Sequence, residues 1–507
     1  MIDGLSKLPQ VAYPPELKIL TEAARNRVLA AAKAQDYYDG NFWRYVENQV
    51  VEWNSQLALP ERNTGKDYHN RKRRGGVLDY VPSKFEFFYP KFFIDELASW
   101  MFENPVGLQG PEENVYAKLE EIHGGNKLDE KLMQGAVEGC LTGGVAIKTL
   151  YNPALGKTRV IVRPSREVFP VMDPDDVDIM EKVHFCILQD DDKTVWRQTF
   201  EMVDGVCYIT EMLFDIEKIG DKGEPTPKKV IKKPQPLYNG NQVIDFIPVT
   251  LIPNEPNLGD IFGISDLEPL YTPINEVCRK FSDAGDAIRF ELFPIKLIMN
   301  VEESETDSFE VSPGAVWYLQ GGDSEHPVDA KNLESRMSNM EYLNTYVDRL
   351  MDMLHQFSGV PRVTRDKIDT IGSVSGVAIK LMFSSIVSKC NRKLMYWRPR
   401  LIEAYDHALR TASVYEGFSY KPDELNLDVL ITPRVPQNEL EQLEMDAKRI
   451  DMLVVKIVDV MQKMGIEKPE EYLAELLAER SETDKVLAGD IYGKAIEQEA
   501  NAGQEMA

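Results

Sequence analysis

Four aspartates that stand close together in the segment VMDPDDVD are the first candidates for chemistry: Asp173, Asp175, Asp176 and Asp178. Hard cations such as Ca²⁺ prefer several carboxylate ligands. A calcium loop starting at Asp173 needs a glycine at its sixth position and an acid at its twelfth, but these positions hold Asp178 and His184. The spacing therefore favours an aspartate-rich turn. A metal-dependent nucleic-acid or nucleotide enzyme with its site near Asp173–Asp178 is the alternative.

Other catalytic and metal-binding patterns are incomplete. Residues 139–148, GCLTGGVAIK, are rich in glycine, but the lysine and the serine or threonine of a phosphate-binding loop are missing at the required positions. The six histidines are scattered, and the five cysteines form no CxxC pair. This usage indicates buried free thiols rather than a disulfide framework or a zinc site. We therefore expect no metal, no cofactor and no enzymatic activity.

Two helical segments carry apolar residues at alternating steps of three and four. The first is expected from Ser265 to about Phe290 and the second from about Ser338 to Ser358. Such a stripe needs another helix beside it. We predict that these side chains form a seam between copies of the chain: Leu270, Ile274, Val277, Phe281, Val347, Leu350 and Leu354.

Capping signals mark the starts of both helices. Ser265 with Glu268, and Ser338 with Glu341, match the capping-box spacing. Prolines in the opening turns of the first helix also allow a bend or a later start near Thr272.

A short strand-rich insert separates the two helices. Strands are predicted at 295–301 and 315–319. Exposed strand edges can accept a partner by strand addition. The candidate docking residues are Ile295, Leu297, Met299, Val316 and Tyr318.

The remaining sequence predicts an α+β protein. Helices are expected at 23–34, 42–57, 90–102 and 128–141, and strands at 145–150, 158–162, 183–188, 206–213 and 246–251. A long helix from about Ser375 to Glu416 contains Pro399, which predicts a kink, and a strand follows at 427–431. Residues 437–507 are helical in pattern, with 8 basic and 17 acidic side chains.

Composition and charge limit the function. Hydrophobic residues make up 43% of the 507 residues, which is enough for large cores. The sequence has no apolar run long enough for a membrane span and no signal-peptide pattern at its start, so we expect a cytoplasmic chain. The net charge of −25 is opposite to that of proteins that grip DNA. Either the chain never contacts nucleic acid, or it contacts nucleic acid without binding it tightly.

A series of short motifs occurs in a characteristic order. They are Gly143-Gly144, Val162–Ser165, Val168–Val171, Ile247–Val249, Gly263–Glu268 with Asn275, Gly359–Pro361, Ser375–Lys380, and the pair Pro433 and Pro436. In this order, over roughly residues 130–450, the chain resembles the portal (head–tail connector) proteins of tailed bacteriophages, in particular the group from long-tailed phages of Gram-positive hosts.

The resemblance implies a portal-like α+β subunit. Its parts would be an α/β wing at 1–263, stem helices at 264–290 and 337–358, and a β-containing clip at 291–336. A tunnel loop would span 359–373, a long kinked helix with the return strand of the wing 374–436, and a helical crown 437–507. The tunnel-loop residues would be Arg362, Arg365, Asp366, Lys367 and Asp369. These side chains would either contact the DNA backbone or form salt bridges between neighbouring loops.

The resemblance also implies a function and partners. Twelve copies would form a ring at one capsid vertex of the virion after assembly in the host cytoplasm. Double-stranded DNA would pass through the ring during packaging and ejection. Terminase, the major capsid or scaffolding protein and a head-completion (adaptor) protein would bind it, and no membrane would be involved. A coiled-coil scaffold that never touches DNA is a further alternative.

Overall fold

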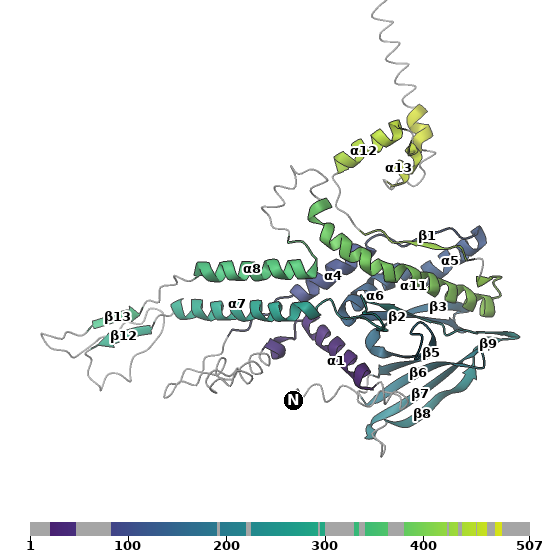
Figure 1. The fold of residues 1–507 in the computed structure, drawn as a ribbon, viewed down its shortest axis with the longest axis horizontal. Coiled ribbons are helices and arrows are strands. Elements are labelled where there is room, and N and C mark those ends of the chain that lie inside the picture. Colours follow the sequence, from purple (N-terminus) through teal and green to yellow (C-terminus); the bar gives the residue numbers. More distant parts are fainter. Residues whose placement is uncertain are drawn as a thin grey trace, which may run out of the picture. The chain divides into compact units, whose positions relative to one another are not determined.

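The chain folds into helices and antiparallel strands, as expected for an α+β protein (Figure 1). The computed structural model describes residues 21–46, 83–189, 193–219, 225–292, 295–299, 329–333, 340–362, 380–422, 425–433, 439–452, 454–463 and 472–478. It divides into two units. The first comprises Met1–Val363 and Phe383–Arg434, and the second comprises Thr364–Met382 and Val435–Ala507.

Among the described residues, the helices before the sheets of the first unit include α1 (Thr21–Tyr38), α4 (Tyr89–Phe102), α5 (Glu113–Asn126) and α6 (Leu128–Thr142). They confirm the helices predicted at 23–34, 90–102 and 128–141, whereas most of the segment 42–57 lies outside the described residues. Helix α6 ends at Gly143, whose φ of 87° lies in the left-handed region that glycine adopts without steric cost. This turn sends the chain directly into the first strand of the sheet.

Two sheets form the β part of this unit. The larger has the order β4-β5-β6-β7-β8, comprising Val168–Met172, Met180–Leu188, Thr194–Val203, Val206–Ile219 and Pro225–Pro236. The smaller has the order β11-β2-β3, comprising Val249–Pro253, Gly144–Asn152 and Lys157–Pro164. The predicted strands are confirmed, although β11 begins at Val249 rather than at Phe246. Pro248, directly before β11, has no backbone N–H to donate to a ladder.

Three smaller strand pairs complete the pattern. Strand β1 (Gly107–Gln109) pairs with β14 (Asp428–Leu430), which confirms the predicted return strand. Strand β9 (Tyr238–Asn239) pairs with β10 (Gln242–Val243). The third pair, β12 and β13, lies between the two long helices in sequence.

Helix α11 (Ser384–Glu416) lies along the smaller sheet and contacts β2, β3 and β11 (Figure 1). Its buried face includes Cys390, Leu394, Trp397 and Leu401, as the steps of three and four predict. Pro399 lies inside the helix. Residues 363–379 are outside the described part of the chain, so the predicted start at Ser375 is not tested.

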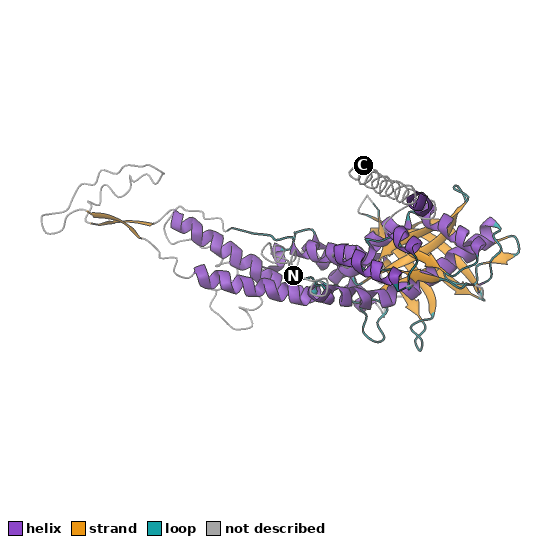
Figure 2. Ribbon diagram, turned by 90° about the horizontal axis from the view of Figure 1, so that it is seen from above, coloured by secondary structure: helices purple, strands orange, loops and turns teal. Residues whose placement is uncertain are grey.

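Helices α7 (Tyr271–Leu292) and α8 (Met340–Ser358) lie side by side and form a helical hairpin (Figures 1 and 2). The prediction that the first helix starts at Ser265 is wrong. A 3₁₀ turn, Glu268–Leu270, comes first, and the α-helix begins at Tyr271, close to the alternative start near Thr272. Pro269, inside the turn, has no N–H for an earlier helical hydrogen bond. The capping residues at Ser338 lie outside the described residues.

Strands β12 (Ile295–Met299) and β13 (Asp329–Leu333) pair antiparallel at the far end of the hairpin, with Leu297 opposite Lys331 (Figure 2). The first predicted insert strand is therefore confirmed. The second, at 315–319, lies outside the described residues.

The second unit contains α12 (Glu439–Asp451) and α13 (Ile457–Lys463), which agrees with the helical pattern predicted beyond residue 437. Asp446 and Val460 are buried in it. Within the described ranges of the whole chain, no helix combines the length and the apolar character needed to cross a bilayer.

Candidate functional site at the base of the hairpin

The predicted seam on α7 and α8 is largely covered by the chain itself. Five of its residues belong to the main hydrophobic core of the same copy: Leu270, Ile274, Val277, Leu350 and Leu354. Val347 is partly buried against that core, and Phe281 is 37% exposed. These side chains therefore do not need a second copy of the chain to bury them.

A different stripe on α8 remains exposed. It consists of Tyr342, Tyr346, Met353 and Phe357, and Tyr342 is the most exposed of them at 77%. Their spacings of four, seven and four residues keep them on one side of a helix. Phe281 and Ile288 on α7 are exposed as well. We call the four residues of α8 the α8 stripe. The sequence contains this signal, but the neighbouring stripe has the more regular spacing and therefore predicts the seam.

The first tunnel-loop candidate is paired within its own copy. Arg362 NH2 lies 3.0 Å from Asp348 Oδ1, and its NH1 lies 2.9 Å from Asp352 Oδ1, both on α8. The Asp352 and Asp348 hydrogen bonds raise the pKa of Arg362 above its ordinary value. The other candidates lie outside the described residues: Arg365, Asp366, Lys367 and Asp369.

The structure describes only some of the candidate docking residues of the clip. Ile295, Leu297 and Met299 are alternate residues of β12, and their backbones pair with Leu333, Lys331 and Asp329 of β13. Val316 and Tyr318 lie outside the described residues.

A buried cluster of charges joins the two ends of the hairpin to α11. The carboxylate of Asp266, just before the 3₁₀ turn, lies 2.9 Å from Lys389 Nζ and 2.6 Å from Lys393 Nζ. Lys389 also donates to the carbonyl oxygen of Ser358, the last residue of α8, at 2.9 Å. Lys393 donates to Asn254 Oδ1, at the end of β11. The segment before α7, the end of α8 and the middle of α11 are thus held at one point.

Burial and mutual attraction set the ionisation of this cluster. Lys393 is only 1% exposed. Burial alone would raise the pKa of Asp266, but the charges of Lys393 and Lys389 lower it below its ordinary value. Burial alone would lower the pKa of Lys393, but the Asp266 charge raises it. Both groups are therefore held in their charged forms. Sequence reasoning missed this cluster because its members are far apart along the chain.

Two glycines allow the close approach that builds the cluster. Gly143 O accepts hydrogen bonds from Asn254 N at 3.0 Å and from Gly263 N at 2.8 Å. A Cβ on Gly263 would overlap the carbonyl oxygen of Asn254. Only the hydrogen atom that glycine carries in place of a Cβ fits at this contact. The backbone at Asn254, directly after β11, can therefore lie against the segment that leads to Asp266.

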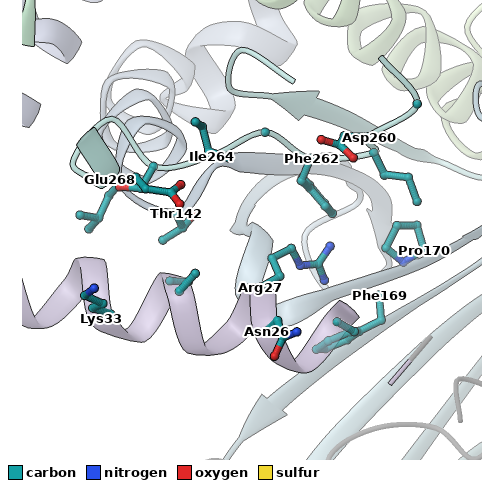
Figure 3. A pocket seen from close by; sticks show the side chains of 18 of the residues that line it. Asn26, Arg27, Lys33, Thr142, Phe169, Pro170, Asp260, Phe262, Ile264 and Glu268 are labelled. Carbon is teal, nitrogen blue, oxygen red and sulfur yellow. The ribbon is translucent and has the colours of Figure 1, made fainter. Parts of the chain in front are cut away.

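A cavity of about 580 Å³ lies between α1 and residues 259–271. Figure 3 shows Arg27 on α1 pointing toward Phe262 and Phe169. The guanidinium lies 4.5 Å from the centre of the Phe262 ring, and its NH2 donates to Val168 O at 2.6 Å. Lys33 Nζ lies 4.2 Å above the Tyr271 ring. These cations therefore tie α1 to the sheet and to the start of the hairpin.

The aspartate segment 173–178 forms turns. Asp173 Oδ1 accepts the backbone N–H groups of Asp175 and Asp176, and Asp176 Oδ1 accepts that of Asp178. These are the local side-chain bonds expected of aspartate in a turn. In the described part of the chain, no group of three or more histidine, cysteine, aspartate or glutamate side chains could hold a metal ion.

The five cysteines are free and buried, as predicted. They lie on five different elements of the first unit: Cys140, Cys186, Cys207, Cys278 and Cys390. Burial raises the pKa of Cys140 to about 12, so its thiol stays neutral beside the charged cluster.

Comparison with known proteins places the chain in a class. The sequence pattern of phage portal proteins matches residues 17–486, which is most of the chain. The chain belongs to the family described as phage portal protein, SPP1 Gp6-like. This family is a structural, non-enzymatic component of the capsid, so the expectation that the chain is not an enzyme is confirmed. No curated protein sequence matches the chain.

Solved structures with similar chains include three from gene transfer agent (GTA) particles. The neck of the empty GTA particle, with C6 symmetry, has a TM-score of 0.38 at 11% identity and covers 74% of this chain and 90% of that chain. For the neck of the native particle, with C12 symmetry, the TM-score is 0.36 at 11% identity, and the match covers 72% of this chain and 84% of that chain. For the native virion, the TM-score is 0.34 at 12% identity, and the match covers 74% of this chain and 88% of that chain.

Proposed function

We propose that copies of this portal protein form a closed ring of twelve at one capsid vertex, with a central channel for double-stranded DNA. The observation that carries the proposal is the α8 stripe, whose apolar side chains stay exposed after the hairpin has covered its own seam. In a ring, the hairpin of a neighbouring copy would cover this stripe. In such a ring, α7 and α8 would pack against each other within one copy, and the α8 stripe would pack against the neighbouring copy.

The charge of the chain supports the role of a conduit. At −25, most of the protein repels phosphates, so a duplex would not stall on the wall of the channel. Arg362 fits this view, because two aspartates of its own copy neutralise it. Contact with DNA through Arg365 and Lys367 remains part of the proposal.

We assign the parts of the subunit by the same proposal. The sheets and α11 form the wing, α7 and α8 the stem, and β12 with β13 belongs to the clip. Residues 359–373 form the tunnel loop, and α12 and α13 belong to the crown. Terminase and the head-completion protein would dock at the clip by strand addition, and capsid or scaffolding protein would bind during assembly in the host cytoplasm. The source would be a long-tailed phage of a Gram-positive host.

The test is the assembly state of the full chain and of two matched variants. Native mass spectrometry and negative-stain imaging should show closed rings with a central hole for the wild type. Tyr346→Asp places a charge on the α8 stripe, whereas Asn344→Asp adds the same charge at an exposed position on another side of α8. We expect folded monomers from the first variant and rings from the second.

Two results would count against the proposal. A wild-type chain that stays monomeric at high concentration, with no hollow particle, overturns the ring. Intact rings from Tyr346→Asp would show that the α8 stripe is not the contact between copies. Leu350→Asp is not a suitable test, because Leu350 is buried in its own copy and the charge would damage the fold of the monomer.

A further inference from the structure

A second, polar cavity of about 330 Å³ lies beside the buried charge cluster, where α8 ends and α11 begins. Gly359 and Asp266 line it from the hairpin side. The rest of its polar wall consists of hydroxyl, amide and charged groups: Asn254, Glu255, Ser265, Gln356, Ser385, Ser388, Lys389 and Arg392. Ser385 and Ser388 are exposed, whereas Lys389 is buried. The cavity therefore has an open rim of hydroxyl groups above a buried ammonium.

Two cations and two carboxylates line this cavity, and Lys393, which is not part of its wall, adds a third cation through its pair with Asp266. Asp266 is shared by Lys389 and Lys393, so two buried cations face one buried carboxylate. Arg392 at the rim has its own partner, with Nε 3.2 Å from Glu255 Oε1. The local excess is one positive charge. An excess charge in a buried place is unfavourable unless an anion or water compensates it, so the wall favours an anionic ligand.

The donors suit an oxyanion. Within the described residues, Lys389 Nζ has acceptors at Asp266 and at Ser358, and an ammonium carries three N–H donors. One donor is therefore left for a ligand in the cavity. The two serine hydroxyls add neutral donors, and Arg392 adds a guanidinium at the rim. A tetrahedral phosphate uses donors from several directions better than a planar carboxylate does.

We propose that this cavity binds a phosphate group, held by Lys389, Arg392, Ser385 and Ser388. All four residues belong to one copy, so the site does not require a ring. The phosphate could be free in solution or part of a nucleic-acid backbone, and only the second source rests on the proposed function. Bound phosphate would also join the end of α8 to the start of α11, which flank residues 363–379 in sequence.

The experiment is calorimetric titration of the full-length chain with inorganic phosphate at constant ionic strength, with chloride as the reference. We expect saturable binding and a higher melting temperature in phosphate. Ser388→Asp places a carboxylate in the cavity. It should raise the melting temperature in phosphate-free buffer. It should weaken phosphate binding by about tenfold or more, because the new carboxylate competes for the Lys389 donor and repels the anion. Asn391→Asp adds the same charge to an exposed site on α11 outside the cavity and should bind phosphate like the wild type.

A parallel titration with short duplex DNA identifies the source. Weaker DNA binding in Ser388→Asp but not in Asn391→Asp assigns the phosphate to nucleic acid, and an effect on inorganic phosphate alone assigns it to a free ion. Absence of phosphate binding by the wild type, or equal affinity in both variants, overturns the proposal. Because Ser388 is exposed, the variant should fold, which circular dichroism checks. A failure to form rings would leave these titrations unchanged, so the two proposals fail separately.

Discussion

Asp266 and Lys393 form an ion pair, with Oδ2 and Nζ 2.6 Å apart, that links the segment before α7 to the middle of α11. The pair is almost completely buried, and Lys389 completes it from one turn earlier on the same helix. Removing one member of such a buried pair leaves a charge without compensation, which is more harmful than losing an exposed pair. The cluster therefore yields predictions that depend on charge balance.

Asp266→Asn should strongly destabilise the first unit, because it leaves two buried ammonium groups without a carboxylate. We expect a loss of about 3–5 kcal/mol in the free energy of unfolding. Denaturant unfolding monitored by circular dichroism measures it. The matched control is Asp178→Asn, which removes an exposed pair with Arg400 and should cost less than about 1 kcal/mol. Equal losses in the two variants would contradict the assignment.

The two lysines should show strong coupling. Lys389→Met or Lys393→Met alone leaves one cation beside Asp266, so each should cost less than Asp266→Asn. The double variant leaves the carboxylate unpaired. It should lose more than the sum of the single variants, by about 1–3 kcal/mol. A double-mutant cycle in denaturant measures this coupling, and additive losses would argue against a shared carboxylate.

Gly263→Ala should be severely destabilising, because its Cβ would overlap the carbonyl oxygen of Asn254. We expect a cost above about 3 kcal/mol from the forced backbone shift. Gly205→Ala is the control. This glycine has a φ of 77° but open space around it, so only the cost of the left-handed backbone, about 1–2 kcal/mol, is expected. Thermal unfolding of both variants tests the difference, and similar melting temperatures would refute the steric argument.

His184 should make the chain less stable in acid. Burial lowers its pKa from 6.5 to about 3, with Arg197 and Lys182 adding to the effect, while Nδ1 lies 2.8 Å from Thr199 Oγ1. Between these two pKa values the unfolded chain binds a proton that the folded chain does not. The free energy of unfolding therefore falls as the pH decreases below 6.5, by up to about 1.4 kcal/mol per pH unit.

Denaturant unfolding at pH 7 and pH 5 tests this expectation. His184→Gln cannot take up the proton, so its loss of stability over this interval should be smaller than that of the wild type by about 2 kcal/mol. An identical loss in both proteins would mean that His184 does not control the acid response.

Local helices and strands and the family of the chain could be predicted from the residues alone. Steps of three and four predict α8 and α11, because this period follows from helix geometry. Strand-favouring residues between turn residues predict β2, β3, β5 and β7. Gly143 marks the end of α6, since a left-handed residue there favours glycine. The ordered motifs from Gly143 to Pro436 indicated the portal family, which the sequence comparison confirmed.

The contacts between these elements could not be predicted from local patterns. A periodic stripe predicts that a helix face will be covered, but it does not predict which chain covers it. The pattern predicts a contact between copies for Leu350, whereas the structure places this residue in the core of its own copy. The pairing of Asp266 with Lys393 joins residues 127 positions apart, and no local pattern encodes such a distance. The α-helix starts at Tyr271 rather than at Ser265, so Asp266 lies in the segment before the helix, where it pairs with Lys393.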